Sequence, residues 1–284
     1  MRLLVFGQTG QVARELVRRA PADVTVTALG RDVANLSDLE SCAAAVAGAK
    51  ADAIINAAAW TAVDRAEAEE AAATVVNGDA PAAMARAAAA RGLPFLHLST
   101  DYVFDGAGHT PFTPDYPTAP LNAYGRSKLA GEAGIRAARG PHLILRTSWV
   151  VSAHGANFVK TMLRLGRERD VLRVVADQIG GPTPAAAIAD ALFTASRAMM
   201  AGAAGGTHHL AGAPDTSWAG LARAVMAGAG LSCRVEDVLT ADYPTPARRP
   251  LNSRLDCTGL ATVFGIPRLD WQAGLSDILK ELSQ

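Results

Sequence analysis

The chain is predicted to adopt an α/β fold in which helices cover both faces of a doubly wound parallel sheet. Short apolar runs alternate with helical segments over the first half of the chain, and the first run ends in a glycine-rich turn. After residue 150 the alternation loosens and clusters of Gly and Pro appear. We therefore expect residues 1–150 to form the main domain and residues 151–284 to form mainly a smaller, substrate-binding lobe.

The apolar runs predict the strands, and the segments between them predict the helices. Strands are expected at residues 2–6, 24–29, 52–55, 94–98 and 142–146, and helices near residues 11–20, 37–48, 64–91 and 123–139. Two later runs, at residues 172–175 and 207–210, are expected to return to the main sheet. Ligands of such sheets bind beyond the carboxyl ends of the strands, so the residues that follow each strand are the candidates for function.

Composition limits the kinds of partner. The formal net charge is zero and no Lys/Arg run occurs, which argues against a nucleic-acid partner and favours a small molecule. No apolar stretch reaches the roughly 18 residues of a membrane span, and the immediate first strand leaves no room for a signal peptide. Cys42, Cys233 and Cys257 are widely spaced, which is typical of reduced thiols in a cytoplasmic protein.

The turn after the first strand has the pattern of a dinucleotide-binding site. Gly7 lets the backbone turn, Gly10 lets it approach a pyrophosphate, and the small Ala13 lets the next helix pack closely on the strand. The N-terminus of that helix offers free N–H groups to the phosphates. The fold is therefore expected to be of the Rossmann type, with NAD or NADP as the cofactor.

The choice between the two cofactors depends on the residues after the second strand. Arg31 stands where an arginine would favour the 2′-phosphate of NADPH, whereas the adjacent Asp32 could bind the ribose hydroxyls of NADH. Arg31 as an ordinary surface charge is the alternative. The sequence therefore leaves both NADPH and NADH open.

Tyr124 and Lys128 are the predicted catalytic pair. They stand four positions apart in a predicted helix, so their side chains share one face. A nearby ammonium should lower the pKa of the phenol from its usual value of about 10 and make Tyr124 a proton donor. Thr100, at the end of the fourth strand, is expected to hold the same carbonyl oxygen. Alternatively, Ser99 and Thr100 only cap the following loop.

Several other residues have two open interpretations. Asn77 either bends a long helix and relays water to Lys128, or simply breaks the helix before Pro81. Arg248 and Arg249 either bind a diphosphate or lie as surface charges in a Pro-rich loop.

Aromatic and histidine residues are divided between binding and structural roles. Trp149, after the fifth strand, is the strongest candidate for an aromatic wall beside a sugar or base, and Trp60 is a weaker one, whereas Trp218 fits an ordinary core position. His208 and His209 lack a third ligand at a metal-binding spacing and are expected to be structural.

Taken together, these motifs resemble the extended short-chain dehydrogenase/reductases and, within them, the dTDP-4-dehydrorhamnose reductase family. The resemblance runs along nearly the whole chain. It rests on Phe6–Val12, Asn56–Asp64, Ser99–Gly106, Pro120–Gly125, Arg146–Val150, Asn157–Phe158 and Arg248–Ser253.

This resemblance implies that a hydride from NADPH or NADH reduces the C4 ketone of dTDP-4-dehydro-β-L-rhamnose, the last step of dTDP-L-rhamnose biosynthesis. Tyr124 would protonate the oxygen, Lys128 would bind the nicotinamide ribose, and Thr100 would hold the carbonyl oxygen. The implied cofactor-binding residues are Gly7, Thr9, Gly10, Gln11, Val12, Arg31, Asn35, Leu36, Ala57, Ala58, Ala59, Thr61, Tyr124 and Lys128. The implied substrate-binding residues are Val63, Asp64, Thr100, Tyr102, Trp149, Asn157 and Arg248.

The resemblance also raises the question of Mg²⁺, which some family members hold with glutamates at a dimer contact. Glu15 and Glu281 stand at comparable places, but Ala187 occupies a position where an acid would be expected. Mg²⁺ is therefore doubtful here and no metal ligand is assigned, while a homodimer stays open.

Three alternatives accompany this interpretation. Nucleotide-sugar dehydratases share the scaffold but carry an Asp-Glu pair after the threonine, and here Tyr102 follows Asp101. The regulatory subunit of methionine adenosyltransferase is also similar and would bind NADP without turnover. Thr100 and the segment from Arg248 to Ser253 favour the reductase. A related dTDP-4-keto-6-deoxy sugar is a third possibility for the substrate.

Overall fold

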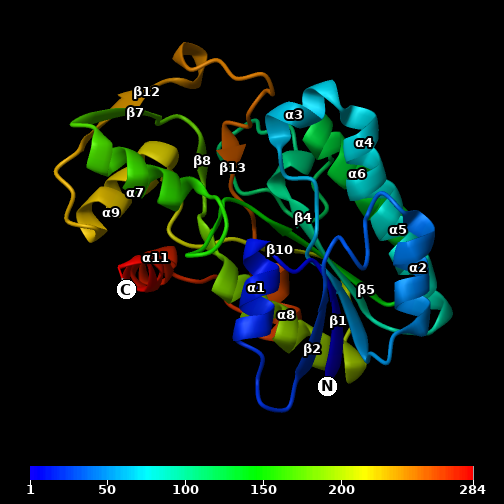
Figure 1. The fold of residues 1–284 in the computed structure, drawn as a ribbon. Coiled ribbons are helices and arrows are strands. Elements are labelled where there is room, and N and C mark those ends of the chain that lie inside the picture. The colour runs from blue at the N-terminus through cyan, green and yellow to red at the C-terminus, as the bar shows by residue number, and fades with distance from the viewer. Residues whose placement is uncertain (284) are drawn as a thin grey trace.

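The computed structural model describes residues 1–283 and has a six-stranded parallel sheet at its centre (Figure 1). The strand order is β10-β5-β4-β3-β1-β2, so the order reverses between β1 and β3, where a ligand crevice is expected. The predicted α/β fold is confirmed. The bounds are β1 Arg2–Phe6, β2 Thr25–Leu29, β3 Ala53–Asn56, β4 Phe95–Thr100, β5 His142–Thr147 and β10 Gly206–Leu210.

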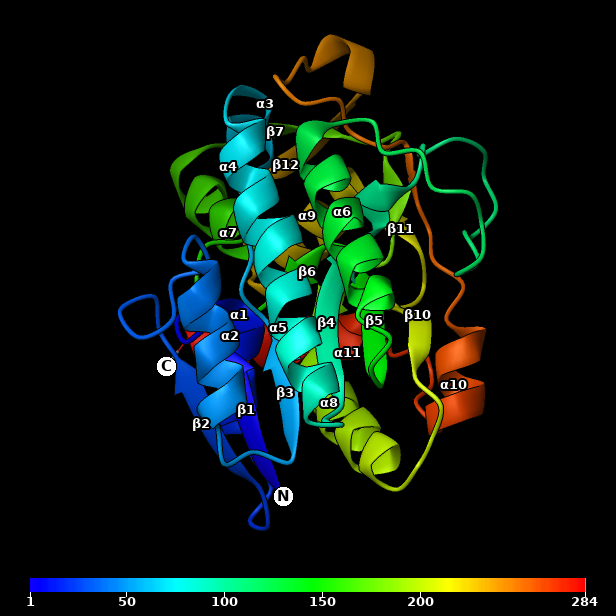
Figure 2. The ribbon, with the colours of Figure 1, turned by 90° about the vertical axis from the view of Figure 1, so that its right-hand side faces the viewer.

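Helices cover both faces of this sheet (Figure 2). On one face lie α2 (Leu39–Gly48), α5 (Ala80–Ala90) and α6 (Ala123–Ala137), and on the other α1 (Gln11–Arg18), α8 (Ala185–Met200) and α10 (Thr258–Phe264). Alternate residues of β1 enter the two cores. Leu3 and Val5 pack with α1 and α8, whereas Leu4 and Phe6 pack with α2 and α5. Burial on both faces explains why the central strands are continuous apolar runs.

The helix predicted over residues 64–91 is interrupted. It consists of α3 (Val63–Ala68), α4 (Glu70–Thr74), the π-helical turn η1 (Val75–Asp79) and α5. Buried Asn77 lies in η1, where its Oδ1 accepts from the Trp60 N–H at 2.8 Å and its Nδ2 donates to Ser127 Oγ at 3.0 Å. A single continuous helix is therefore a wrong prediction, because the helical backbone is broken at Glu69, while Asn77 lies in a π-helical turn that joins α4 to α5 without a break. Its contacts are to Trp60 and Ser127 rather than to Lys128.

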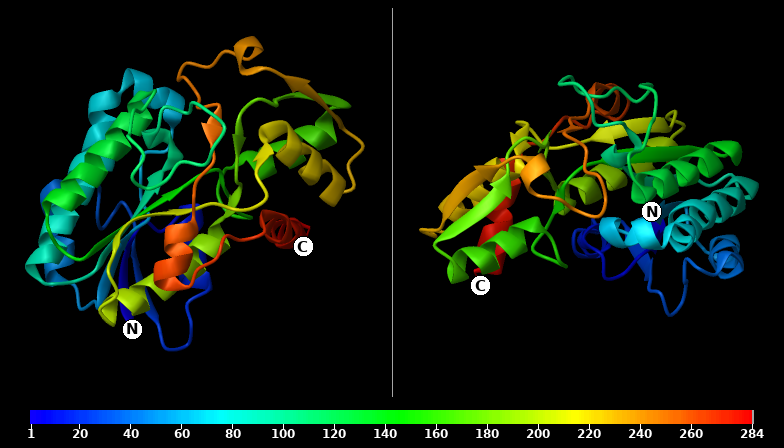
Figure 3. Two further views of the ribbon diagram at one scale, coloured as in Figure 1. Left: turned by 180° about the vertical axis from the view of Figure 1, so that it is seen from behind. Right: turned by 90° about the horizontal axis from the view of Figure 1, so that it is seen from above.

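A second core fills the C-terminal lobe, seen from behind and from above in Figure 3. Here α7 (Phe158–Glu168), α9 (Trp218–Gly228) and α11 (Trp271–Leu282) share one apolar core with β7 (Val171–Val175) and β12 (Arg234–Val238), which pair in parallel. Short pairs complete the lobe: β6 (Val150–Val151) with β9 (Thr183–Pro184), and β8 (Ile179–Gly180) between β11 (Thr216–Ser217) and β13 (Asn252–Ser253).

The two later strands behave differently from each other. β10 pairs with β5, which confirms that residues 207–210 return to the main sheet. The prediction for residues 172–175 is wrong, because β7 pairs with β12 instead. Leu172 and Val174 are buried while Arg173 between them is exposed. Such one-sided burial does not suit a sheet that is covered on both faces.

The second half of the chain contributes to both parts of the molecule. Beyond residue 150, α8, β10 and α10 belong to the main sheet and its covering layer, whereas α7, α9 and α11 form the lobe. The chain therefore passes between the two parts more than once. Among the helices of residues 1–283, none is long and apolar enough to cross a membrane.

Candidate active site

The turn between β1 and α1 has the geometry that the glycine pattern predicts. Gly7 has φ +109°, which L-residues with a side chain rarely adopt. Gly10 precedes α1 without a side-chain cap, and a Cβ built there would meet no atom within 4 Å. The first N–H groups of α1 have no intrahelical acceptor and no side-chain cap. This arrangement fits a bound pyrophosphate.

A cavity of about 530 Å³ extends from this turn along the ends of β1 and β2, and we call it the cofactor cavity. Arg31 and Asp32 both line it, so the structure keeps both cofactor options in place. Ten predicted cofactor-binding residues line this cavity: Gly7, Thr9, Gly10, Arg31, Asn35, Leu36, Ala57, Ala58, Ala59 and Thr61.

A second cavity of about 430 Å³ lies at the ends of β4 and β5, and we call it the catalytic cavity. It meets the cofactor cavity at Ala57, Ala59 and Thr61, which line both. The structure thus brings the two predicted sets of residues to one crevice. The catalytic cavity is lined by the predicted residues Gln11, Val12, Val63, Thr100, Tyr102, Tyr124, Lys128, Trp149 and Asn157.

Helix α6 carries Tyr124 and Lys128 to this wall. Asn122 caps the helix by accepting from the Gly125 N–H at 2.8 Å. Gly125 lies directly against the Tyr102 carbonyl, with which an added Cβ would collide. This close approach places the first turn of α6 on the 3₁₀ turn η2 (Asp101–Val103), and the rings of Tyr102 and Tyr124 meet edge to face at 5.5 Å.

Lys128 is held in a buried polar chain that the sequence did not reveal. Its Nζ lies 2.7 Å from the Leu98 carbonyl oxygen and 3.0 Å from His97 Nε2. His97 Nδ1 lies 3.1 Å from Asn56 Nδ2, and Asn56 Oδ1 accepts from the Ala58 N–H at 3.1 Å. Burial lowers the pKa of Lys128 to about 8, with the Glu132 charge opposing the change. The only signal in the sequence was a histidine within an apolar strand.

The expected effect of Lys128 on Tyr124 is not what the structure shows. Burial raises the pKa of Tyr124, and the charge of Asp101 raises it further, while the Thr100 hydroxyl opposes the rise. The prediction of a lowered pKa is wrong here because the Lys128 ammonium is directed to His97 and Leu98. Tyr124 is thus a neutral phenol, which is the form that can donate a proton.

Thr100 both caps η2 and lines the catalytic cavity, so the two interpretations of this residue coexist. Its Oγ1 accepts from the Tyr102 N–H at 3.2 Å and lies 3.1 Å from Asp101 Oδ1. Asp101 is itself buried and lines the same cavity. Burial raises the pKa of Asp101 to about 6, although the hydroxyls of Ser253 and Thr100 act in the opposite direction.

Aromatic side chains form the wall on the lobe side of the cavity. Trp149 has the left-handed φ of +50° and stacks on Trp218, with ring centroids 3.8 Å apart and an interplanar angle of 14°. Phe158 packs against Trp218 at 4.7 Å. Trp218 packs against the lobe core, as predicted, and in addition lines the cavity. Trp60 lines the cofactor cavity instead.

Of the two adjacent arginines, Arg249 reaches the cavity. Its guanidinium donates to Asp64 Oδ2 at 2.8 Å and to the Tyr102 hydroxyl at 3.3 Å. Arg248 is exposed, does not line either cavity, and contributes its carbonyl oxygen to Asn122 Nδ2 at 2.8 Å. The structure therefore favours Arg249 over Arg248, and it connects Asp64 to the site through Arg249.

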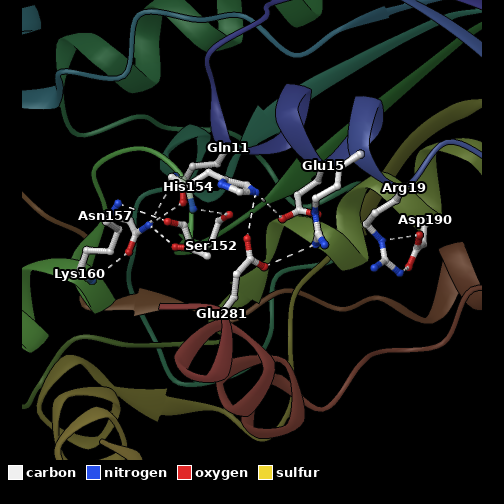
Figure 4. A network of polar contacts seen from close by, with 11 residues as sticks. Gln11, Glu15, Arg19, Ser152, His154, Asn157, Lys160, Asp190 and Glu281 are labelled. Carbon is white, nitrogen blue, oxygen red and sulfur yellow. Dashed lines mark hydrogen bonds and ion pairs between the residues drawn. The ribbon is translucent and has the colours of Figure 1, made fainter. Parts of the chain in front are cut away.

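Asn157 joins the lobe to the glycine turn (Figure 4). It caps α7 by accepting from the Lys160 N–H at 3.2 Å, and its Nδ2 donates to Gln11 Oε1 at 3.0 Å. Since Gln11 begins α1, a side chain of the lobe is fixed directly beside the cofactor turn.

The two carboxylates considered for Mg²⁺ face the basic side chains of Arg18 and His154 (Figure 4). His154 Nε2 lies 3.6 Å from Glu15 and 3.5 Å from Glu281, and Arg18 lies 2.7 Å from Glu15 and 3.8 Å from Glu281. Within residues 1–283 no cluster of three or more His, Cys, Asp or Glu side chains could hold a metal ion. Mg²⁺ at a dimer contact therefore stays a doubtful prediction from the sequence.

His208 and His209 lie in β10, away from both cavities. His208 packs edge to face on Phe264 with ring centroids 5.3 Å apart, and His209 does the same on Phe104 at 5.7 Å. These contacts support the structural interpretation of both residues.

Comparisons with known proteins agree with this geometry. The family model for the RmlD substrate binding domain matches residues 1–284. A dTDP-4-dehydrorhamnose reductase of Sinorhizobium fredii is 46% identical over 279 residues, covering 96% of this chain and 94% of the relative. The solved reductase of Clostridium acetobutylicum has a TM-score of 0.94 and 31% identity over the whole of both chains. That of Bacillus anthracis, in complex with NADP, has a TM-score of 0.91 and 30% identity over 99% of each chain. The chain belongs to the dTDP-4-dehydrorhamnose reductase family.

Proposed function

We propose that this protein uses NADPH or NADH to reduce the C4 ketone of dTDP-4-dehydro-β-L-rhamnose to dTDP-L-rhamnose. The observation that carries the proposal is the convergence of Thr100, Tyr124 and Lys128 on a cavity that opens into the cofactor cavity. A proton donor, a hydroxyl and an amine thus lie where a carbonyl would meet a nicotinamide. The names of the curated relatives support the same reaction.

The cofactor would be held by the glycine turn, by Arg31, Asn35 and Leu36 after β2, and by Ala57–Ala59 and Thr61 after β3. When bound, the nicotinamide supplies the hydride. Lys128 is positioned to bind the ribose hydroxyls because α6 and His97 hold its Nζ at the cavity wall. NADPH is the preferred cofactor in this proposal because Arg31 can pair with a 2′-phosphate.

Protonation of the substrate oxygen is assigned to Tyr124. Its phenol is neutral in the buried site, so it can give up its proton as the hydride makes the oxygen negative. The hydroxyl of Thr100 would donate a second hydrogen bond to the same oxygen and stabilise the developing charge. The C4 hydroxyl of the product then carries the proton from Tyr124.

The nucleotide-sugar would lie along the lobe. Trp149, Trp218 and Phe158 offer flat apolar surfaces, and Arg249 offers a planar fork of N–H groups that suits a diphosphate. A further cavity of about 250 Å³ continues past Trp218, Tyr102 and Arg249 and has room for the nucleoside end. Val63, Asp64 and Asn157 complete the proposed substrate contacts.

The setting of the enzyme belongs to the same proposal. Cys42, Cys233 and Cys257 are all free and buried, as is usual in a reducing compartment, which supports a cytoplasmic location. A homodimer and a small-molecule rather than nucleic-acid partner remain predictions from the sequence.

The test is turnover with the keto-sugar generated in place by the preceding epimerase. NADPH oxidation that yields dTDP-L-rhamnose would support the proposal, and the ratio of rates with NADPH and NADH would rank the cofactors. Tyr124→Phe should bind NADPH as the parent does but lose roughly 10²- to 10⁴-fold in kcat. Cofactor binding without any oxidation of the keto-sugar would contradict the assigned reaction.

A further inference from the structure

Asp101 is a second acidic group in the catalytic cavity, and the reaction proposed above gives it no role. It follows Thr100 directly, is 2% exposed and lines the cavity beside Tyr124. Its Oδ1 lies 3.1 Å from Thr100 Oγ1, and its Oδ2 has no hydrogen-bond partner within residues 1–283. No lysine, arginine or histidine of the described chain forms an ion pair with it.

A buried carboxylate with an unpartnered oxygen and no cation is a costly arrangement. The groups that face Asp101 are the Tyr124 phenol from α6, the Tyr102 phenol from its own turn, and the Ser253 hydroxyl from β13. All three are neutral at ordinary pH. Arg249 contacts the Tyr102 hydroxyl and Asp64 rather than Asp101. The hydroxyls of Ser253 and Thr100 and the backbone N–H groups of Asp101 and Tyr102 favour the carboxylate, but burial outweighs them and raises the pKa of Asp101 to about 6. Below that pH the carboxyl group is mostly neutral.

The protonation state of Asp101 decides what the Thr100 hydroxyl can do. A hydroxyl has one hydrogen to donate and two lone pairs to accept with. One lone pair of Thr100 Oγ1 already accepts from the Tyr102 N–H. Beside an ionised Asp101, which can only accept, the contact at 3.1 Å requires Thr100 to donate its single hydrogen to the carboxylate. None is then left for a substrate oxygen.

We propose that Asp101 is a positioning residue for ketone reduction, acting as a neutral carboxylic acid whose O–H is donated to Thr100 Oγ1 so that the Thr100 hydroxyl hydrogen is free for the substrate oxygen. The inference rests on the proposed function. Asp101 keeps its own proton throughout, and Tyr124 supplies the proton that ends on the product.

The neutral acid has a second effect on the same oxygen. An ionised Asp101 raises the pKa of Tyr124 and would repel the negative charge that develops as the ketone is reduced. Protonation of Asp101 removes this charge. The freed Thr100 hydrogen and the removal of the negative charge therefore both favour turnover when Asp101 is protonated.

The test is the pH dependence of kcat/KM at saturating NADPH for the wild type and Asp101→Asn. For the wild type we expect a decline that begins above about pH 6 and approaches tenfold per pH unit. An Asn side chain is always neutral and can donate an N–H to Thr100 Oγ1. Asp101→Asn should therefore lose this decline, so that its ratio of kcat/KM at pH 6 to that at pH 8 falls by at least tenfold relative to the wild type.

Two results would overturn the proposal. A decline of equal size and position in Asp101→Asn would assign it to another group, and a loss of 100-fold or more at every pH in a folded Asp101→Asn variant would show that the carboxylate is required. Asp101→Asn in a Thr100→Val background tests whether Asp101 acts through the Thr100 hydroxyl. Without that hydroxyl only the effect of the Asp101 charge on Tyr124 remains, so Asp101→Asn should change the ratio of kcat/KM at pH 6 to that at pH 8 by less than it does in the wild-type background. An undiminished change there would remove Thr100 from the account.

The failure of this inference can be told apart from failure of the proposed function. If the wild type oxidises no NADPH with the keto-sugar at any pH, the reaction assignment fails. If it does turn over, and only the pH profiles of wild type and Asp101→Asn coincide, the reaction stands and the role of Asp101 fails. NADPH affinity and thermal unfolding of each variant show whether it is folded.

Discussion

Two buried carboxyl groups lie near β4, and their surroundings shift their pKa values in opposite directions, so that below about pH 6 Asp101 is mostly neutral while Glu132 is still ionised. Glu132 lies on α6. Its carboxylate accepts a hydrogen bond from Ser99 Oγ at 2.6 Å and two from the Arg146 guanidinium at 2.7 and 2.8 Å. Asp101, only two residues after Ser99, meets hydroxyls and no cation. Burial opposes ionisation of both groups, but the hydrogen bonds and charges around Glu132 outweigh it and lower its pKa.

This difference shows that the neighbouring groups, rather than the degree of burial, determine whether a buried carboxyl group is ionised. An ionised Glu132 ties α6 to β4 and β5 and so fixes the helix that carries Tyr124 and Lys128. A neutral Asp101 is instead available as a hydrogen-bond donor inside the cavity. One acid serves the scaffold and the other, by our inference, serves the reaction.

Removing the cation from the Glu132 region should have the largest effect on stability. Arg146→Met leaves an ionised, buried Glu132 without its main partner, so we expect a loss of about 3–5 kcal/mol in the free energy of unfolding, measured by urea denaturation. Adding Glu132→Leu should restore part of the loss because the uncompensated charge disappears. A loss below about 1 kcal/mol in the single variant would show that Glu132 does not depend on Arg146.

The two acids should also give opposite pH dependences of stability. The pKa of Asp101 rises from 3.8 to about 6 on folding, so its contribution is fully present below about pH 4 and is lost as the pH rises through 6. The shift of about two units corresponds to about 3 kcal/mol. Glu132, with its lowered pKa, contributes stability that is lost as the pH falls.

Asp101→Asn should therefore gain stability relative to the wild type as the pH rises from about 4 through 6, and Glu132→Gln should lose its disadvantage only as the pH falls below about 4.5. The measurement is the urea midpoint of each protein from about pH 3 to about pH 8. Parallel pH curves for Asp101→Asn and the wild type would mean that Asp101 titrates normally and that the two regions do not differ.

Arg249 is a cation on the wall of the same cavity as Asp101, and it contacts the Tyr102 hydroxyl. If Arg249 binds the substrate diphosphate, Arg249→Met should raise KM for the nucleotide-sugar by roughly 10- to 100-fold, the size expected for the loss of a charge-assisted hydrogen bond. The matched control is Arg248→Met, at the exposed neighbour, where KM should change less than about twofold. Equal effects of both substitutions would place the diphosphate in the loop rather than in the cavity.

The smallest effect is expected at the exposed edge of the Glu132 network. Arg136 also contacts Glu132, at 2.8 Å, but its side chain is 41% exposed. Arg136→Met should cost no more than about 1 kcal/mol of unfolding free energy in urea, since solvent screens such a pair. A cost as large as that of Arg146→Met would show that burial does not separate the two arginines.

The sequence predicted the parts of the fold that repeat a local pattern. The strands of the first half and the turn at Gly7 could be placed because apolar runs, glycines and helical segments alternate in the order that a parallel sheet requires. The same regularity led to Tyr124, Lys128 and Thr100, which follow or face the strand ends. The prediction placed β7 in the wrong sheet because a short apolar run does not indicate which strand it will pair with.

The rest of the site depends on contacts between distant residues. Arg249 rather than Arg248, Trp218 as well as Trp149, and His97 beside Lys128 were decided by side-chain direction and by pairings across the fold. Likewise, Asp101 and Glu132 are both acids near polar residues in the sequence, and nothing there says that only Glu132 meets Arg146. The difference between Asp101 and Glu132 arises from contacts between residues far apart in the sequence, which sequence periodicity does not reveal.

The most direct test of this account is an infrared measurement of the protonated carboxyl band in the wild type, Asp101→Asn and Glu132→Gln between pH 5 and pH 8. We predict a protonated carboxyl band in the wild type at pH 5 that is missing from Asp101→Asn, persists in Glu132→Gln, and fades as the pH rises past about 6. A band that is the same in the wild type and Asp101→Asn at every pH, or one that is lost in Glu132→Gln instead, would contradict the assignment of a neutral acid to Asp101 and an ionised one to Glu132.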